Sequence, residues 1–415
     1  MSCSSIRSKL IFPSSILFLV LILLMATPRS VRAQTLTTLY SFTGINGDGA
    51  YPFTGVVVDP EGNLYGTTNA GGERWNYGTA YVVRPSGEET VLHAFSNGPN
   101  AYPLGSLILD TNGNLYGTTY GWSHGNHVSY GTVFELTTTN KEKVLYNFKK
   151  TFGANGWSPA AGLLMDGRGH LYGTTEYGGA SFNGTVFQVT AKGQETVLHS
   201  FDCNTDGCQP EAPLVMDGNG NLFGTTIHGG TFANGTVFEL TASGTESVLY
   251  NFGCGSDGCT PYGGLVFDGQ GNLFGTTRQG AGNGCGGGGC GTVFKLTPDG
   301  RETVLYRFTG GTDGGAPFAG LILDGDGNLY GTTFVGGDLA CGSGYGCGTV
   351  FKIGPSGSET VLYAFAGGVD GAAPYGGVVR DPQGNLYGTT LYGGLGTCAP
   401  GGAITGCGVV FKLTP

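Results

Sequence analysis

The sequence has little charge, and basic residues are scarce. Of its 415 residues 12% are charged, with 19 Lys and Arg against 29 Asp and Glu. Residues 1–33 hold four of the basic residues and no acidic one, which leaves 15 − 29 = −14 for the rest of the chain. An acidic chain without basic clusters repels phosphate backbones and anionic lipids. We therefore expect no nucleic-acid partner.

Long hydrophobic runs are absent after the first 33 residues. Before that point, Arg7 and Lys9 precede the apolar run Ile16–Met25, and Val31-Arg32-Ala33 comes directly before Gln34. This order is typical of a secretory signal peptide, and the run is shorter than the ~20 residues that span a bilayer. We predict a signal peptide over residues 1–33, with a retained membrane anchor as the alternative. The mature chain is expected to be secreted or extracellular, or else periplasmic, without membrane insertion.

The C-x₂-C spacing typical of metal-binding thiolates is also absent. Cys3 lies in the predicted signal peptide, and the other ten cysteines lie close together two by two. An even number of cysteines in an exported chain indicates disulfides. The predicted pairs, each within one loop, are Cys203 with Cys208, Cys254 with Cys259, Cys285 with Cys290, Cys341 with Cys347, and Cys398 with Cys407.

Glycine, in contrast, is abundant, and all 82 glycines come after residue 33. Glycine at this density excludes a helical bundle, because each one costs about 1 kcal/mol in a helix. Collagen is excluded because the glycines are not at every third position. With 39% hydrophobic and 12% aromatic residues, the chain has enough core material to fold. The composition predicts many short strands joined by tight turns.

A repeat identifies the fold. The segment Asn-Leu-Tyr/Phe-Gly-Thr-Thr recurs seven times, once with His for Asn, at intervals of 51 to 57 residues. Each unit is predicted to contain four strands, which in the fifth unit are Gly264–Asp268, Asn272–Thr277, Thr292–Thr297 and Glu302–Phe308. The last two strands carry apolar residues on both faces, so their sheet must be covered on both sides. Units of this size that stack sheet on sheet are typical of propellers.

The two ends of the chain complement each other. Thr37–Phe42 reads as a fourth strand with no others before it, and Val409–Leu413 as a third strand with none after it. Pairing them closes the ring and removes exposed sheet edges. We predict an all-β, seven-bladed β-propeller of four-stranded blades over residues 34–415, a single domain. The expected units are about 44–95, 96–148, 149–201, 202–252, 253–308, 309–365, and 366–415 with 34–43.

The full unit reads G-G-L-V-x-D-x-x-G-N-L-Y-G-T-T, then G-G, then G-T-V-F-x-L-T-x-x-G-x-E-T-V-L-Y-x-F. It resembles the GloVer (Gloeo/Verruco) tandem repeat of exported bacterial proteins, from Thr37 to Thr414. More distantly it is similar to the NHL and kelch propellers, although the kelch Trp is missing. The resemblance implies a secreted repeat protein of unassigned activity.

Two families of loops are expected to lie on opposite faces of the ring. One face, which we call the turn face, carries the turns between the first and second strands and between the third and fourth strands of each unit. The loop face carries the other connections, all the length variation and all ten mature cysteines, and loops of this kind are where binding usually occurs. On the turn face, an Asp ends the first strand of every unit, and we interpret it as a turn-forming residue. These are Asp59, Asp110, Asp166, Asp217, Asp268, Asp324 and Asp381.

A second series of aspartates comes before the first strand, in Asp-Gly pairs on the loop face. Turn chemistry explains these residues as well, and a bound cation such as structural calcium is the alternative; no cofactor is otherwise expected. The pair His124-x₂-His127 is an incomplete metal-ligand set. The aspartates of this series are Asp48, Asp206, Asp257, Asp313 and Asp370.

The sequence lacks the G-x-S-x-G, H-E-x-x-H and phosphate-binding motifs of familiar enzymes. We therefore expect a non-catalytic binding or structural module. The alternative is a metal-dependent lyase or lactonase with its site at the mouth of the central channel. Its candidate carboxylates are Glu176, Glu211 and Asp338, which lie near strand ends on the loop face.

All three tryptophans fall in the first three units, in loops without cysteine. We name as the Trp surface the group Trp75, Tyr77, Tyr120, Trp122 and Trp157, and predict that it binds an extended ligand. Trp and Tyr present rigid apolar faces with a polar edge. The alternative is that each Trp packs its own loop against the blade. The expected ligand is a neutral polysaccharide, or an extracellular protein or peptide, bound by a monomeric chain.

Overall fold

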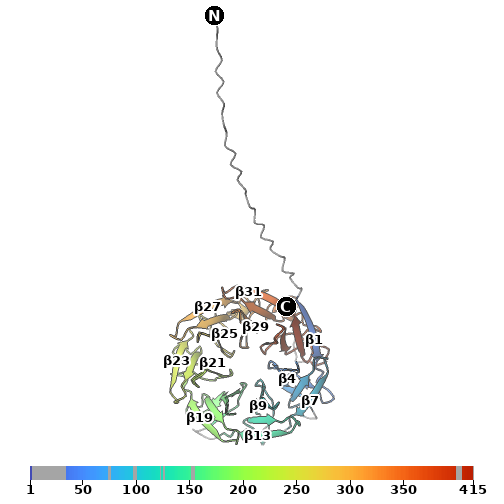
Figure 1. The fold of residues 1–415 in the computed structure, drawn as a ribbon, viewed down its shortest axis with the longest axis vertical. Coiled ribbons are helices and arrows are strands. Elements are labelled where there is room, and N and C mark those ends of the chain that lie inside the picture. The colour runs from blue at the N-terminus through green and yellow to red at the C-terminus, as the bar shows by residue number, and fades with distance from the viewer. Residues whose placement is uncertain are drawn as a thin grey trace. The chain divides into compact units, whose positions relative to one another are not determined.

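Seven four-stranded antiparallel sheets surround a central axis in the computed structural model of the protein (Figure 1). By its internal contacts the chain divides into two units, Met1–Ala33 and Gln34–Pro415. Only the second unit is described below. Within it the structure describes residues 34–72, 76–96, 101–121, 123, 124, 127–150, 155–398 and 404–414, without the side chains of 123, 124, 127 and 128. The predicted seven-bladed propeller is confirmed.

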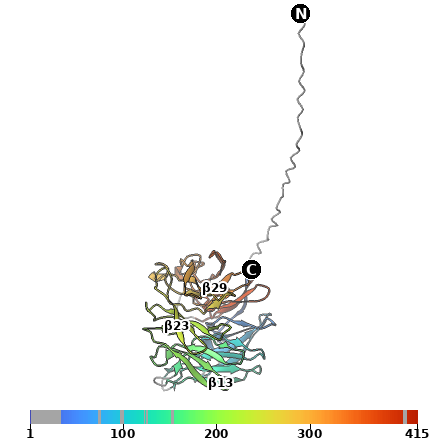
Figure 2. The same cartoon turned by 60° about the vertical axis from the view of Figure 1, so that its left-hand side comes forward.

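Each blade runs from a short inner strand to a longer outer one, so that β7, β13, β19, β23, β27, β31 and β1 form the outer wall (Figures 1 and 2). From inside to outside, blades 1 to 3 contain β3 (Val57–Val58), β4 (Leu64–Thr68), β6 (Thr79–Val83) and β7 (Glu89–Ala94); β8 (Ile108–Leu109), β9 (Leu115–Thr119), β12 (Thr132–Leu136) and β13 (Glu142–Asn147); and β15 (Leu164–Met165), β16 (Leu171–Thr175), β18 (Thr185–Val189) and β19 (Glu195–Ser200). Blades 4 and 5 contain β20 (Val215–Met216), β21 (Leu222–Thr226), β22 (Thr236–Leu240) and β23 (Glu246–Asn251); and β24 (Val266–Phe267), β25 (Leu273–Thr277), β26 (Thr292–Leu296) and β27 (Glu302–Arg307). Blades 6 and 7 contain β28 (Ile322–Leu323), β29 (Leu329–Thr333), β30 (Thr349–Ile353) and β31 (Glu359–Ala364); and β32 (Val379–Arg380), β33 (Leu386–Thr390), β34 (Val409–Thr414) and β1 (Thr35–Ser41).

The loops add three short ribbons and two single-turn 3₁₀ helices. The ribbons pair β2 (Gly49–Ala50) with β5 (Ala70–Gly71), β10 (Ser123–His124) with β11 (His127–Val128), and β14 (Gly156–Trp157) with β17 (Tyr177–Gly178). The helices are η1 (Cys285–Gly287) and η2 (Gly342–Gly344). In the ribbons β2–β5 and β14–β17, the loop that enters a blade pairs with the loop between the second and third strands of that blade. Both kinds of loop therefore lie on one face, as predicted.

The ring closes as predicted. β1 pairs antiparallel with β34, from Thr35 opposite Thr414 to Ser41 opposite Val409, and so becomes the outer strand of blade 7. Phe42, directly after β1, is fully buried between blades 7 and 1. The first described segment of the chain thus completes the blade formed by its last strands.

The inner strands are shorter than the sequence predicts. In blade 5 the predicted strand Gly264–Asp268 pairs only over Val266–Phe267. Near the axis the blades converge, and a side chain on Gly263 would come within 2.5 Å of the Ala319 carbonyl of the next blade. Directly before the predicted strand, the neighbouring blades therefore leave no room for a side chain.

The repeated Gly-Thr-Thr segment has a packing role at each position, as blade 5 shows. A Cβ on Gly275 would lie 2.6 Å from the ring of Phe294, so glycine makes room for this buried ring. The Thr276 hydroxyl donates a hydrogen bond to the Ala319 carbonyl of the next blade, at 2.9 Å. The second threonine shares a hydroxyl–hydroxyl bond with a threonine on the third strand in blades 1 to 6.

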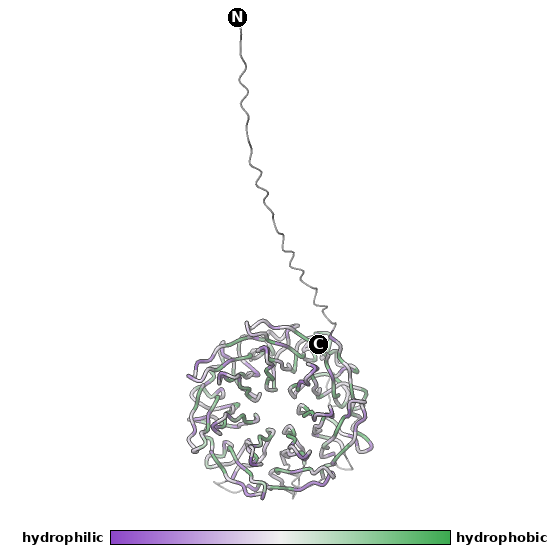
Figure 3. Tube along the Cα trace, in the orientation of Figure 1, coloured by the Kyte–Doolittle hydropathy of each residue, from purple (hydrophilic) through white to green (hydrophobic). Residues whose placement is uncertain are grey.

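Hydrophobic side chains fill the spaces between adjacent blades. Apolar and polar residues are interspersed along the chain trace of the ring (Figure 3). All five predicted disulfides are present, between cysteines five to nine positions apart and each within one loop. Among the described residues, no helix has the length and apolarity needed to cross a membrane.

The aspartates of the turn face form turns, as predicted. In blade 2, Asp110 Oδ1 accepts the backbone N–H groups of Asn112 and Asn114, both at 2.8 Å, and Oδ2 accepts the Tyr116 hydroxyl at 3.3 Å. Burial raises the pKa of Asp110, but these bonds and that from the Asn114 side chain outweigh it and hold the pKa below its ordinary value. The carboxylate is therefore committed to the turn.

Candidate functional site

A short motif places one variable side chain per blade at the end of the central channel. The loop entering each blade has a residue with left-handed backbone, φ between 51° and 60°, then a proline. The N–H of that residue bonds the preceding blade; for example, Gln209 donates to the Asn183 carbonyl at 2.8 Å. The backbone is thereby fixed, and the residue after the proline is free to vary.

In all seven blades, the residue after the proline lines a cavity of about 320 Å³ on the loop face, which we call the channel mouth. Ligand pockets typically measure about 300–1,000 Å³, so the cavity fits a small ligand or the end of a chain. The residues that follow the proline, from blade 1 to blade 7, are Phe53, Leu104, Ala160, Glu211, Tyr262, Phe318 and Tyr375.

Four aromatic residues of the channel mouth form a continuous arc over blades 5, 6, 7 and 1. Tyr375 stacks on Phe318 with 4.4 Å between ring centroids and 25° between planes. Phe53 meets Tyr375 edge to face at 5.3 Å, and Tyr262 meets Phe318 in the same way at 5.3 Å. All four are half-buried, so the arc keeps part of its aromatic surface in contact with solvent.

A positively charged arginine side chain lies against this arc. The guanidinium of Arg278, which follows β25, is 4.7 Å from the ring centroid of Phe318 and 5.5 Å from that of Tyr262. Cation–π contact with two rings holds the guanidinium in place. Arg278 therefore supports two of the rings that line the mouth.

Acidic groups occupy the other side of the mouth, in blades 3 and 4. Burial raises the pKa of Glu211 to about 8, with a further increase from the nearby Glu176 and a partial decrease from Arg278. Glu176 accepts a hydrogen bond from the Tyr120 hydroxyl at 2.6 Å and one from the Gln209 amide at 3.4 Å. At neutral pH, Glu211 is therefore mostly protonated and can donate a hydrogen bond.

The structure brings two of the three predicted carboxylates together and separates the third. Glu211 lines the channel mouth, and Glu176 lies near enough to raise the pKa of Glu211. Asp338 is exposed in the loop after β29, where its carboxylate accepts the Ala340 N–H at 3.0 Å, and it does not line the cavity. Two carboxylates are fewer than the set a lactonase-type metal site requires.

The predicted Trp surface is described only in part, because Trp75 and Trp122 lie outside the described residues. Trp157, in β14, is half-buried and stacks on Tyr177 with 6.5 Å between centroids. Tyr77 is 6% exposed. Tyr120 is half-buried and reaches Glu176 at the channel mouth. The role of the Trp surface in ligand binding therefore stays a prediction.

Sequence reasoning missed the aromatic arc and Arg278. Tyr, Phe and Arg occur throughout the strands, and nothing in composition separates these from core residues. The available signal was a contrast within the repeat, since the proline is the same in all seven units while the residue after it changes. Five residue types at one fixed backbone position, Phe, Leu, Ala, Glu and Tyr, indicate that folding does not require a particular side chain there.

The comparisons with known proteins agree with the fold. The Gloeobacter/Verrucomicrobia repeat matches residues 28–155, 120–287 and 283–415. The chain belongs to this repeat family. No curated protein sequence matches it.

Among solved structures, the extracellular domain of a chain described as a hybrid two-component system of B. thetaiotaomicron is similar over 91% of this chain, with 10% identity and a TM-score of 0.54. A second structure of that extracellular domain gives a TM-score of 0.52 at 10% identity and 91% coverage. This chain covers 39% and 40% of the two sensor chains. A gluconolactonase from Xanthomonas campestris aligns over 73% of this chain and 82% of its own length at 14% identity, with a TM-score of 0.39. At these identities the likeness to the sensor domain shows the fold alone.

Proposed function

We propose that this repeat propeller is an exported, non-catalytic binding module that holds a neutral carbohydrate at the channel mouth. The observation that carries the proposal is one cavity lined by the aromatic arc and Glu211, with Arg278 packed on two of the rings and Glu176 near Glu211. Five disulfides support a location outside the cytoplasm.

Carbohydrates match the two kinds of surface in the mouth. The C–H faces of a sugar ring pack on aromatic rings, and its hydroxyl groups both donate and accept hydrogen bonds. Glu176 supplies acceptors, Arg278 supplies donors, and protonated Glu211 supplies both. With a formal net charge of −10, the protein favours a neutral or basic glycan over a polyanionic one.

Exposed apolar residues also favour the loop face as the contact surface. Among the described residues from Gln34 onward, eight large apolar side chains are exposed, and only Val144, on β13, lies in a blade strand. The other seven belong to loop-face connections and could contact a polymer longer than the mouth itself. They are Ile45, Phe182, Phe232, Leu339, Tyr345, Val369 and Leu395.

The test is binding of the purified protein to an array of neutral glucan, mannan and galactan oligosaccharides, followed by calorimetry with the best binder. Tyr375→Ala should weaken binding by about 10- to 100-fold, the effect of removing a central aromatic contact. Tyr345→Ala is the matched control, because this tyrosine is exposed on the same face but does not line the mouth. Equal affinity of the two variants, or binding only to protein or peptide probes, would contradict the proposal.

Trp157→Ala separates the channel mouth from the Trp surface. If the ligand extends over blades 1 to 3, this substitution should also weaken binding to long oligosaccharides and leave short ones unaffected. If Trp157 only packs its loop, as its contact with Tyr177 allows, the melting temperature should fall with no change in affinity.

A second candidate function is acid–base catalysis at the same mouth. The observation in its favour is the raised pKa of Glu211 beside a second carboxylate, an arrangement common in active sites. Glu211→Gln distinguishes the two functions, since a binding module should keep its affinity while an enzyme should lose turnover of the bound glycan.

A further inference from the structure

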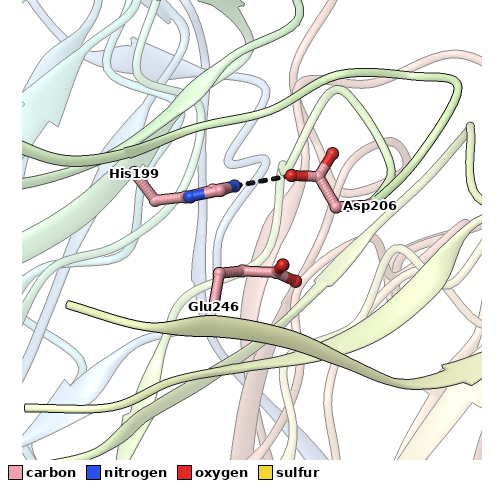
Figure 4. Close-up of side chains that lie close together, drawn as sticks. All are labelled: His199, Asp206 and Glu246. Carbon is pink, nitrogen blue, oxygen red and sulfur yellow. Dashed lines mark hydrogen bonds and ion pairs between the residues drawn. The ribbon is translucent and has the colours of Figure 1, made fainter.

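We propose that His199, Asp206 and Glu246 form a binding site for a divalent transition-metal ion, with zinc as the best fit, at the junction of blades 3 and 4. One ligand atom from each side chain lies within 4.8 Å of the other two. Figure 4 shows the imidazole of His199 directed at the carboxylate of Asp206, with the carboxylate of Glu246 beside them. The site is separate from the channel mouth, since none of the three residues lines that cavity.

The three side chains come from three different elements. His199 is near the end of β19, the outer strand of blade 3, and Glu246 begins β23, the outer strand of blade 4. Asp206 lies in the loop between β19 and β20. A shared ion would therefore connect the outer strands of two blades with the loop between them.

The other junctions show what is particular to this one. At the next two junctions the outer-strand residue is a tyrosine whose hydroxyl donates to the loop aspartate: Tyr250 to Asp257 at 3.2 Å, and Tyr306 to Asp313 at 3.1 Å. A neutral phenol is a poor ligand for zinc, whereas imidazole is among the best. The change from Tyr to His at position 199 therefore converts a hydrogen-bonded junction into a potential metal site.

The ligand set and its spacing suit zinc. Zinc–nitrogen and zinc–oxygen bonds measure about 2.0–2.2 Å, so tetrahedral ligand atoms lie about 3–3.5 Å apart. His199 Nε2 and Asp206 Oδ2 are 2.7 Å apart, and small side-chain movements would admit an ion between them. One nitrogen and two carboxylate oxygens would leave a fourth position for water.

Two of the ligands are already held in position. Asp206 Oδ1 accepts the Asp202 N–H at 2.7 Å, and the Cys203–Cys208 disulfide closes the same loop. The His199 ring packs edge to face on Phe201, with 4.8 Å between centroids. Because the loop and the ring are constrained before binding, little ordering would be required when an ion arrives.

Glu246 begins its outer strand as Glu89, Glu302 and Glu359 begin theirs, and all four have an Oε1 atom that is shielded from solvent and accepts no hydrogen bond in the structure. Among the described residues, only Glu246 has a histidine and an aspartate beside it that complete a group of three ligands. A buried carboxylate oxygen without a partner is costly. A cation shared with His199 and Asp206 would satisfy it.

The experiment is calorimetric titration of the untagged, metal-stripped protein with Zn²⁺, with disulfides intact so that no thiolate competes. The expected result is saturable binding of one ion per chain, with a rise in melting temperature that a chelator reverses. Glu246→Gln preserves side-chain shape and should weaken Zn²⁺ binding by at least about tenfold. His199→Tyr restores the residue of the neighbouring junctions, so it should fold normally and bind no zinc at this site.

His93→Tyr is the matched control. His93 occupies the corresponding place on β7, near Glu142 at 3.5 Å, and belongs to no described group of three ligands. This variant should bind Zn²⁺ like the unmodified protein. The proposal is overturned if the unmodified protein shows no saturable binding, if His199→Tyr and Glu246→Gln bind as tightly as it does, or if His93→Tyr removes the binding.

Discussion

The turn face and the loop face of the ring are built on the same strands but use polar residues differently. On the turn face, the repeated aspartates are occupied by backbone N–H groups, as Asp268 is by those of Gln270 and Asn272. On the loop face, the backbone is fixed by a left-handed residue and a proline, and the next side chain varies from Glu to Leu to Tyr. Uniform chemistry on one face serves the fold, and variation at a fixed position on the other is available for function.

Both faces depend on the closed ring, so the largest effect should follow from opening it. Deleting residues 34–43 removes β1 and the buried Phe42 and exposes the edge of β34. The loss should exceed the ~3–5 kcal/mol typical for removal of one buried Phe. Urea denaturation followed by circular dichroism measures it. A variant that unfolds as cooperatively and at the same urea concentration as the full chain would show that β1 is dispensable.

The comparison between the faces is tested more directly by one substitution on each. Asp268→Ala on the turn face leaves the N–H groups of Gln270 and Asn272 without their acceptor and should cost about 1–2 kcal/mol of stability. Glu211→Ala on the loop face removes a carboxyl whose burial is unfavourable when charged, and should cost less. Thermal melts of the two variants at neutral pH decide the order, and a larger loss for Glu211→Ala would mean that the channel mouth is structural.

The sequence predicted features that depend on the repeat and missed those that depend on geometry across blades. The seven Gly-Thr-Thr segments and the unpaired strands at the two ends were enough for blade number and closure, because each is a local pattern. The length of β24 was overestimated, because the local pattern does not show how closely the next blade approaches near its start, as at Gly263 and Ala319. The proximity of Glu176 to Glu211 could not be predicted for the same reason, since the two residues belong to different blades and only the geometry of the ring brings them together.

A third set of carboxylates, between the blades, belongs to neither face and should have the smallest effect. At the junction of blades 4 and 5, burial, reinforced by the nearby Asp257, raises the pKa of Glu302 to about 7 from an ordinary 4.5. Similar shifts to about 7 affect Glu89 and Glu359. In every case burial is the main cause, and Glu302 Oε1 has no hydrogen-bond partner.

The sign of the pH effect follows from these directions. Between about pH 4.5 and 7 the folded protein binds more protons at these glutamates than the unfolded chain, so their contribution to stability falls as pH rises through that window. The turn-face aspartates act oppositely, since their lowered pKa values make stability fall when pH drops below about 4. Stability should therefore be greatest near about pH 4–5.

Glu302→Gln tests the pH effect at one junction between blades. The amide cannot ionise, so the variant should be more stable than the unmodified protein at about pH 8 and no more stable at about pH 5. Glu302 is only partly buried, which limits the gain to about 0.5–1 kcal/mol. Melting temperatures at the two pH values measure it, with Glu61→Gln on the turn face as the control because this glutamate is exposed. A gain of equal size at both pH values would mean that packing, rather than ionisation of the buried carboxyl, is responsible.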